Sequence, residues 1–172
     1  DRLYQVQRYE AAIQKDPEFA MAHAALGLAY SSHIYSNAVK GRRHYERALE
    51  LAGRTTDRER LSIRASYEAD LGHEQEATRL FEAYLQSYPN DIPMRGSFAR
   101  MLMLRDHCQD AIGQFQELTR LVPRRASAWV NLATCFGHLG QYRQALGSYA
   151  KAFEIEPTWM TSDNLNHEYG FL

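Results

Sequence analysis

Residues 126–157 read ASAWVNLATCFGHLGQYRQALGSYAKAFEIEP, and this stretch decides the fold. It ends at Pro157, and Pro123 and Pro89 precede that residue at the same interval of 34 positions. A period of this length is typical of a helix-turn-helix unit repeated along the chain. The sequence therefore predicts a stack of similar helical pairs that offers a binding surface, rather than a fold built around one active-site cleft.

Small residues recur at one place in each helix of the repeat. In the first helix they are Gly27, Ala65, Ala99 and Ala133, and in the second helix they are Gly41, Ala77, Ala111 and Ala145. A larger side chain at either place would push apart the two helices that cross there. We therefore expect the two sets to face each other in a close contact.

Aromatic residues recur one turn further along the second helix, at Tyr9, Tyr45, Phe81, Phe115 and Tyr149. They share a helical face with the small residues, so we expect them to fill the gap between neighbouring repeats. The recurring prolines end the second helix and let the next helix start in a new direction. Together these positions predict an all-α solenoid of antiparallel helix pairs.

The segment from Trp129 to Pro157 resembles the tetratricopeptide repeat, whose pattern is W-x-x-L-G-x-x-Y, then A-x-x-x-F, then P. The resemblance covers nearly the whole chain and implies a right-handed α-α superhelix whose first helices line a concave groove. On this basis residues 1–172 form a single array with partial repeats at 1–19 and 160–172 and full repeats at 20–57, 58–91, 92–125 and 126–159. Because both ends fall inside a repeat and repeats normally need caps, we expect a piece of a longer protein.

The upstream repeats depart from the period, because Pro17 and Pro89 lie 72 positions apart, four more than two periods. We expect the extra residues near Ser36-Asn37 and near Gly53-Arg54-Thr55. The solenoid should bend or widen there.

The stretch Thr56-Asp57-Arg58-Glu59 has the form of a capping box, which predicts that a helix starts there. The inner register of this helix stays open. Arg64 and Glu68 occupy positions that are apolar in the other repeats, and Ile63 and Tyr67 could replace them by a slip of one residue.

Residues 56–67 followed by 88–91 are also similar to tails attached to bacterial membrane serine/threonine kinases and to some bacterial transcription regulators. A kinase glycine loop, a catalytic aspartate motif and a membrane span are all missing from this sequence. The likeness therefore implies no kinase activity for this chain.

In the tetratricopeptide family, groove contacts come from fixed positions of the first helix. The matching residues here form a mixed set, part apolar and part polar: Met21, Ala24, Leu28, Ser62, Ser66, Arg100, Met103, Asn131, Thr134, His138 and Asn164. The two-carboxylate clamp of some members is not implied, because only Asn131 matches it, with Arg100 nearby, and its lysines are missing. An arginine and an asparagine could still hold a carbonyl or carboxylate of an extended peptide.

The overall charge argues against two classes of partner. A hydrophobic content of 45% predicts a folded chain, and a net charge of −1 with a pI near 6.7 does not favour nucleic acid or an anionic membrane surface. No apolar run of about 18 residues and no signal-peptide layout occur, so we expect no direct membrane contact. The compartment is not identified; a cytoplasmic location is favoured over a domain outside a bacterial inner membrane.

Metal and catalytic sites are not expected. His73 and His107 occupy the same turn position, but stacked helices lie about 8–10 Å apart while His–Zn bonds measure about 2 Å, so solvated turn histidines are favoured. His23 stands where the pattern often has Trp and is expected to be a partly buried core ring. Cys108 and Cys135 lie in different helices and look like buried thiols.

Catalysis has one further candidate pair, since His138 lies one helical turn beyond Cys135, but ordinary helix packing explains that spacing equally well. No G-x-S-x-G elbow or phosphate-cradling glycine motif is present. The sequence therefore predicts no enzyme, no cofactor and no metal.

Six arginines in the upstream half could form a basic edge for an acidic partner: Arg42, Arg43, Arg54, Arg58, Arg60 and Arg64. Acidic residues are interleaved among them, so a solvated surface of ion pairs is the favoured interpretation.

The main functional prediction is a non-catalytic interaction module that binds a protein segment or peptide along the concave groove. One alternative is a self-associating structural spacer, a homo-oligomer joined through exposed terminal helices. This alternative rests on the apolar stripe of Val6, Tyr9, Ala12 and Ile13, which a preceding helix would cover. Another alternative is a ligand-sensing segment of a larger bacterial kinase or transcription regulator.

Overall fold

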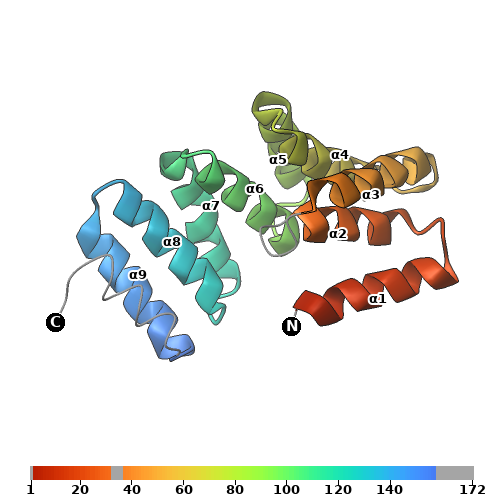
Figure 1. The fold of residues 1–172 in the computed structure, drawn as a ribbon. Coiled ribbons are helices and arrows are strands. Elements are labelled where there is room, and N and C mark those ends of the chain that lie inside the picture. Colours follow the sequence, from red (N-terminus) through yellow and green to blue (C-terminus); the bar gives the residue numbers. More distant parts are fainter. Residues whose placement is uncertain (1, 32–36, 158–172) are drawn as a thin grey trace. The chain divides into compact units, whose positions relative to one another are not determined.

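The computed structural model describes residues 2–31 and 37–157. Within these stretches the secondary structure consists of nine α-helices and one short 3₁₀-helix, η1. Their bounds are α1 Arg2–Lys15, α2 Ala20–Ser31, α3 Ala38–Leu51, η1 Ala52–Arg54, α4 Asp57–Leu71, α5 Glu74–Ser87, α6 Ile92–Leu104, α7 Cys108–Leu121, α8 Ala126–His138 and α9 Tyr142–Ile155 (Figure 1).

The chain divides into two compact units between Pro89 and Asn90. In the first unit α2 pairs with α3 and α4 pairs with α5, while α1 packs mainly against α2. In the second unit α6 pairs with α7 and α8 pairs with α9, and Figure 1 shows α8 and α9 running side by side in opposite directions. The four pairs cover residues 20–51, 57–87, 92–121 and 126–155. The expected partial repeat at 160–172 lies outside the described residues.

The expected close contact at the helix crossing is confirmed in the pair α2 and α3. A Cβ atom added to Gly27 would lie 2.7 Å from the ring of Tyr45, which is fully buried. A Cβ atom on Gly41 would lie 3.0 Å from the carbonyl oxygen of Gly27 and closer still to the hydroxyl of Ser31. Only glycine therefore fits where these two backbones meet. The alanines at the equivalent places in the other repeats are all fully buried: Ala65, Ala77, Ala99, Ala111, Ala133 and Ala145.

The recurring aromatic residues lie in the interior, with one exception. Tyr45, Phe81, Phe115 and Tyr149 are each at most 1% exposed, whereas Tyr9 is 38% exposed. Because α2 is the main neighbour of α1 within the described residues, the other side of α1 keeps Tyr9 at the surface.

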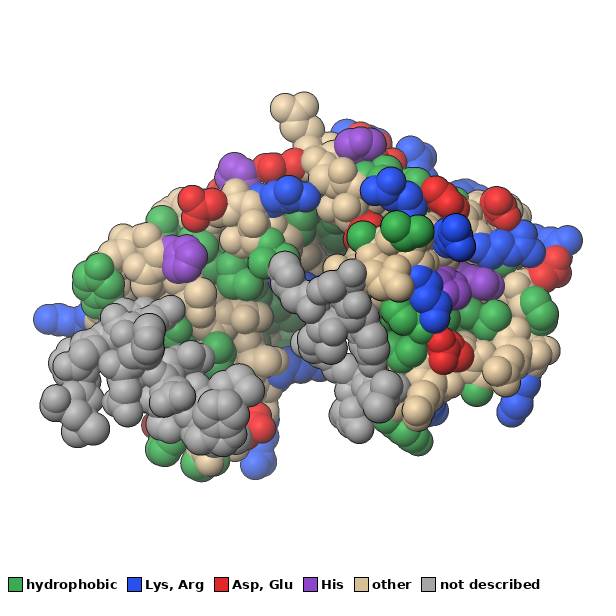
Figure 2. Space-filling model, viewed as in Figure 1, with side chains coloured by type: hydrophobic (Ala, Val, Ile, Leu, Met, Phe, Trp, Pro, Cys, Tyr) green, Lys and Arg blue, Asp and Glu red, His purple; other side chains and the backbone are tan. Residues whose placement is uncertain are grey.

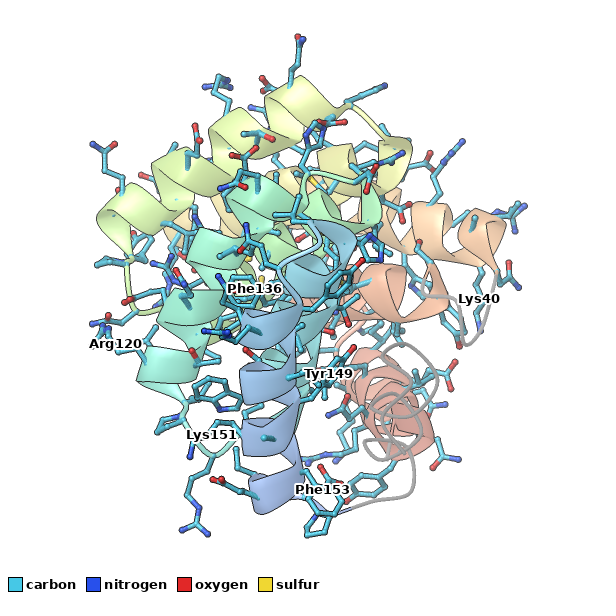
Figure 3. All side chains as sticks on the ribbon, turned by 90° about the vertical axis from the view of Figure 1, so that its left-hand side faces the viewer. Lys40, Arg120, Phe136, Tyr149, Lys151 and Phe153 are labelled. Atoms are coloured by element: carbon cyan, nitrogen blue, oxygen red, sulfur yellow. The ribbon has the colours of Figure 1, made fainter. Side chains whose placement is uncertain are left out.

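Burial on α9 decreases toward the end of the helix. Phe136 of α8 and Tyr149 of α9 are buried, whereas Phe153, one turn beyond Tyr149, is 41% exposed (Figure 3). Because residues four positions apart share a helical face, the contact with α8 buries the middle of this face and leaves its end at the surface.

The helix start at Thr56 is confirmed as a capping box. The hydroxyl of Thr56 accepts from the amide of Glu59, and the Glu59 carboxylate accepts from the amide of Thr56 at 3.0 Å. The bond from the Thr56 amide is the largest cause that lowers the pKa of Glu59, and the Thr56 hydroxyl, which also donates to this carboxylate at 2.8 Å, is the second. The extra residues predicted near Gly53-Arg54-Thr55 lie in η1 and the turn after it. Of the pair Ser36-Asn37, Ser36 lies outside the described residues and Asn37 caps the start of α3.

The register of α4 follows the alternative that the sequence left open. Ile63 is 1% exposed, and the half-buried ring of Tyr67 lies 5.9 Å from that of Tyr45. Arg64 lies at the surface, 3.8 Å from Glu76. The slip of one residue therefore turns the charge of Arg64 outward and the apolar side chains inward.

The prediction of an exposed apolar stripe on α1 is wrong for two of its four residues. Val6 is buried in a cluster with Leu26 and Tyr30, and Ile13 packs against the same cluster. The apolar side of α1 therefore faces α2 rather than an absent neighbour. The observation that favoured self-association through this stripe is lost.

Candidate interaction surface

The first unit brings few of the predicted groove residues to the surface. Met21 and Ala24 of α2 pack in the core cluster that contains Ile63. Ser62 is 7% exposed, and its hydroxyl donates to the Glu59 carbonyl at 2.8 Å. Leu28 is 40% exposed and Ser66 is half-buried. In this unit Leu28 is thus the predicted side chain that a ligand could reach most easily.

The second unit keeps a larger accessible set on its first helices, α6 and α8. Arg100 and Met103 of α6, and Asn131 and Thr134 of α8, are each half-buried, and His138 at the end of α8 is exposed. We call these five residues the α6–α8 face. The remaining candidate, Asn164, lies outside the described residues.

Two members of the α6–α8 face are held by their neighbours. The hydroxyl of Thr134 lies 3.1 Å from the carbonyl of Val130 and 3.3 Å from the hydroxyl of Tyr149. Its hydroxyl is therefore engaged both by the backbone of α8 and by Tyr149 of α9. The Nδ1 atom of His138 lies 3.8 Å from the Asp106 carboxylate, which joins the end of α8 to the turn after α6.

The α6–α8 face supplies two kinds of chemistry. The Arg100 guanidinium and the Asn131 amide can donate hydrogen bonds to carbonyl or carboxylate oxygens, and Met103 can adapt to an apolar side chain. Such a mixture suits an extended peptide, which exposes backbone oxygens and alternating side chains.

Asp106 is a residue that the sequence reasoning missed. It adopts φ 64°, in the left-handed region, where the equivalent turns have Gly72 at φ 80° and Gly140 at φ 70°. In each turn the next amide bonds back to the helix, as in His107 to the Leu102 carbonyl at 2.9 Å. The signal was present in the sequence, because residues 72, 106 and 140 follow the 34-residue period.

Exposed apolar side chains flank the turns between α6 and α7 and between α8 and α9 in the second unit. Leu104 and Tyr142 are each 59% exposed, and Leu139 is 38% exposed. The strained backbone at Asp106 lies between Leu104 and the start of α7. These turns therefore present both apolar surface and a carboxylate.

A polar network joins α1, α2 and α3. The hydroxyl of Tyr30 donates to the Glu10 carboxylate at 2.5 Å and accepts from Lys40 Nζ at 2.6 Å. The bond from Tyr30 holds the pKa of Glu10 below its usual value, whereas burial raises the pKa of Tyr30. The tyrosine therefore stays protonated and works as a bridge between the two charges.

Beside this network lies a pair of histidines. His44 stacks on Tyr30 with ring centroids 5.7 Å apart, and its Nδ1 atom lies 3.1 Å from Nδ1 of His23. Burial is the main cause that lowers the pKa of His44, followed by the charges of His23 and Lys40. His23 is 8% exposed, which confirms it as a core ring.

The two cysteines are buried, as predicted, and the structure brings them together. Cys108 begins α7, Cys135 lies in α8, and each is at most 1% exposed. Burial raises the pKa of the Cys135 thiol, and a hydrogen bond with Cys108 adds to this. The side chain of His138, in contrast, is exposed and does not face the buried Cys135 thiol.

The turn histidines are exposed, as expected. His73 precedes α5 and its Nδ1 atom lies 2.7 Å from the Glu68 carboxylate, and His107 precedes α7 in the same way. Among residues 2–31 and 37–157, no three histidine, cysteine, aspartate or glutamate side chains are grouped closely enough to hold a metal ion.

Four of the six upstream arginines have partners, in agreement with the ion-paired surface that the sequence favoured. Arg54 pairs with Glu18, Arg60 with Asp57 and Arg64 with Glu76. Arg58 donates to the Tyr84 hydroxyl at 2.9 Å and lies over the ring of Tyr88. Figure 2 shows the same mixture, with basic and acidic side chains interspersed over the visible face.

Comparison with proteins of known structure places the fold. The chain is similar to YrrB, a tetratricopeptide repeat protein whose crystal structure has an unusual peptide-binding site. The two sequences are 20% identical, the TM-score is 0.62, and the match covers 96% of this chain and 85% of YrrB. It is also similar to MamA of Desulfovibrio magneticus RS-1, with 18% identity, a TM-score of 0.63 and coverage of 85% and 83%. The chain has the tetratricopeptide repeat fold, an α-α solenoid.

A curated relative, Superkiller protein 3 of Schizosaccharomyces pombe, is 23% identical over an alignment of 157 residues that covers 87% of this chain. The chain spans only 11% of the length of that relative. No family model matches the chain. In the described part of the chain, every helix is too short or too polar to cross a membrane.

Proposed function

We propose that this tetratricopeptide repeat chain is a non-catalytic interaction module that binds an extended protein segment on its first helices, with the α6–α8 face as the main contact. The observation that carries the proposal is the accessibility of Arg100, Met103 and Asn131 on two first helices of one unit. Polar donors beside an apolar side chain match the alternating surface of an extended peptide.

Three further observations support a binding role. The fold is shared with YrrB, a protein that has a peptide-binding site. The cysteine with a shifted pKa is a buried thiol that is harder to ionise, which is the opposite of an activated nucleophile. The α6–α8 face carries the hydrogen-bond donors of Arg100 and Asn131 beside the apolar side chain of Met103, a combination that suits recognition.

The test begins with a ligand chosen without bias. Peptides are selected from a displayed random library on the full chain, and the affinity of a selected synthetic peptide is measured by calorimetry. The double variant R100A/N131A should weaken binding about tenfold or more, since two polar contacts of an interface core contribute on the order of 1.4 kcal/mol together.

The matched control removes the same residue types from exposed turns of the same unit. The variant N90A/R124A should bind the peptide as the wild type does, because Asn90 and Arg124 lie outside the α6–α8 face. Equal affinity of the wild type and R100A/N131A would refute the placement of the ligand on this face. Failure of any library peptide to bind would count against an extended peptide as the ligand class.

A further inference from the structure

The exposed side of α3 carries two arginines without a partner among the described residues. Arg42 and Arg43 are exposed and make no hydrogen bond, ion pair or ring contact with any described residue. Elsewhere on the same helix Lys40 bonds to Tyr30 and Arg47 pairs with Glu50. The guanidinium groups of these two consecutive residues thus remain available to an outside partner.

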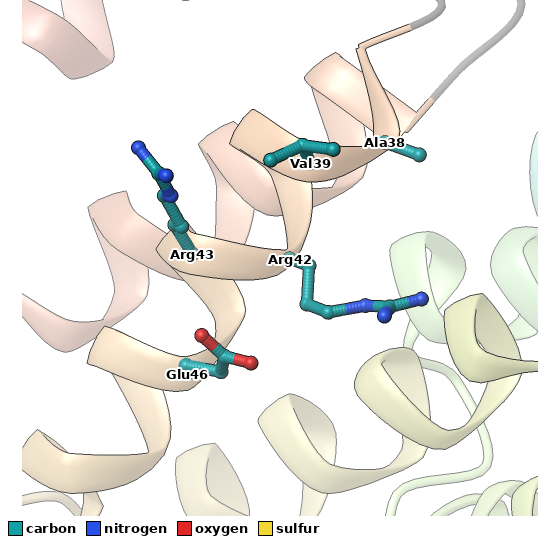
Figure 4. A pocket seen from close by; sticks show the side chains of 5 residues that line it. All are labelled: Ala38, Val39, Arg42, Arg43 and Glu46. Carbon is teal, nitrogen blue, oxygen red and sulfur yellow. The ribbon is translucent and has the colours of Figure 1, made fainter.

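The surface around these arginines is shaped and partly apolar. Ala38, Val39, Arg42, Arg43 and Glu46 line a shallow depression on this one helix. Val39 is 68% exposed, the largest exposed fraction among the bulky apolar side chains of the described residues. Figure 4 shows Arg42 and Arg43 pointing away from each other on the two sides of α3. An apolar spot therefore lies with a cationic group to either side.

The position on the helix adds to the positive potential. All five lining residues lie in the first nine positions of α3, which starts at Ala38. The side chain of Asn37 accepts from only one of the free amides of the first turn, that of Lys40 at 3.0 Å. The start of a helix carries a partial positive charge that favours anions.

Glu46 limits what can bind. It lies one turn beyond Arg42 and makes no ion pair with either arginine in the described structure, so it does not neutralise them. Its charge would repel a dense polyanion such as a nucleic acid, whose phosphates follow one another closely along the backbone. A partner with separate carboxylates can pair with the arginines while it avoids Glu46.

We propose that Val39, Arg42 and Arg43 form a second docking surface, the α3 face, for an acidic peptide segment in which one apolar side chain lies between carboxylates. Each arginine donates hydrogen bonds to one carboxylate, and the apolar side chain covers Val39. Charge-assisted pairs of this kind are the stronger hydrogen bonds, and they suit arginine because its fork matches a carboxylate. The α3 face lies on a second helix, so this proposal is independent of the α6–α8 face.

The experiment uses the full chain labelled with nitrogen-15 and a capped synthetic peptide with two glutamates on each side of one leucine. Titration followed by amide chemical shifts should move the signals of α3 around Val39, Arg42 and Arg43. The same peptide with glutamine in place of every glutamate should bind about tenfold more weakly or not at all, because the charged pairs are lost.

Three variants sharpen the result. R42Q/R43Q should abolish the shifts on α3, and E46Q should tighten binding by about twofold to fivefold, since it removes a repelling charge. The matched control R60Q/R79Q also removes two arginine charges of the same unit, but these are paired with Asp57 and Glu76. It should leave the affinity within about twofold of the wild type, because long-range charge is screened beyond roughly 10 Å.

Several outcomes would overturn the proposal. An equal loss of binding in R60Q/R79Q would mean that net charge rather than the α3 face attracts the peptide. Shifts confined to α6 and α8 would assign the peptide to the α6–α8 face. Tighter binding of a short oligothymidylate, lost in R42Q/R43Q, would make the α3 face a site for nucleic acid instead.

Discussion

His23 and His44 face each other through their Nδ1 atoms, 3.1 Å apart. The other ring nitrogen of His23, Nε2, lies 3.2 Å from the carbonyl of Pro17, which can only accept a hydrogen bond. This assigns the His23 proton to Nε2, so its Nδ1 atom accepts from Nδ1 of His44. Trp129 makes the equivalent bond, from Nε1 to the carbonyl of Pro123 at 2.9 Å.

The histidine pair predicts a loss of stability in mild acid. Because burial holds the pKa of His44 below its ordinary value of 6.5, the unfolded chain binds the proton before the folded chain does. The free energy of unfolding should be highest above pH 6.5 and should fall as the pH decreases from 6.5 toward the lower pKa of the folded state. Urea denaturation at several pH values above about 5 measures this, since carboxylates titrate mostly below that range.

The variant H44Q tests the assignment, because a glutamine amide can donate to His23 but does not titrate. Its urea midpoint should change less over this pH range than that of the wild type. A wild-type slope in H44Q would show that another group causes the acid sensitivity.

Two glycine-to-alanine changes should have opposite signs. In G27A the new methyl group would meet the ring of Tyr45 at 2.7 Å, so we expect a loss of about 1–3 kcal/mol from overpacking. In G113A, on the exposed side of α7, no atom lies within 4 Å of the added Cβ. That change should stabilise the chain by about 0.5–1 kcal/mol through helix propensity. Thermal and urea unfolding measure both, and equal effects would contradict the close crossing of α2 and α3.

The turn at Asp106 should gain stability from glycine. We expect D106G to raise the free energy of unfolding by about 0.5–1 kcal/mol, because glycine adopts a positive φ without the steric cost of a side chain. The reverse test is G140A, which should lose about 1 kcal/mol from the backbone alone, since the added Cβ would meet no atom within 4 Å. A destabilised D106G would mean that the Asp106 carboxylate, 3.8 Å from His138, contributes more than its backbone costs.

Removal of the capping box should weaken the start of α4. T56A deletes the hydroxyl that accepts from the Glu59 amide, and such changes cost about 1 kcal/mol. The variant should also raise the lowered pKa of Glu59 part of the way toward its ordinary value, because it removes the bond from the Thr56 hydroxyl, whereas the backbone amide of residue 56, the larger cause of the shift, remains. Nuclear magnetic resonance titration of Glu59 checks this, with T78A inside α5 as the control that leaves the pKa of Glu59 unchanged.

The fold could be predicted from the sequence where one physical constraint acts on one position. The crossing of Gly27 and Gly41 and the burial of Phe81 and Phe115 follow from side-chain size repeated at a fixed interval. The start of α4 follows from local hydrogen bonding at Thr56. Such constraints are visible in the chain itself and need no knowledge of which elements become neighbours.

Features that depend on a neighbour were harder to predict. An apolar stripe on α1 is visible in the sequence, but only the packing shows that Val6 and Ile13 turn toward α2. The six upstream arginines are alike in the sequence, and only the structure separates the paired Arg60 from the unpaired Arg42. For the predicted groove the same reason applies, since Ala24 and Ser62 are closed off by packing while Arg100 is not.

The bridge through the Tyr30 hydroxyl has a consequence for the order in which parts of the chain open. Glu10 is the residue of α1 that this bridge holds, whereas α2 packs against α1, α3 and α4. In hydrogen exchange, the amides of α1 should therefore lose protection faster than those of α2, because a local opening breaks few contacts. While α1 is detached, Leu26 and Tyr30 are exposed to water. The lifetime of the bridge therefore sets how often this apolar surface becomes exposed.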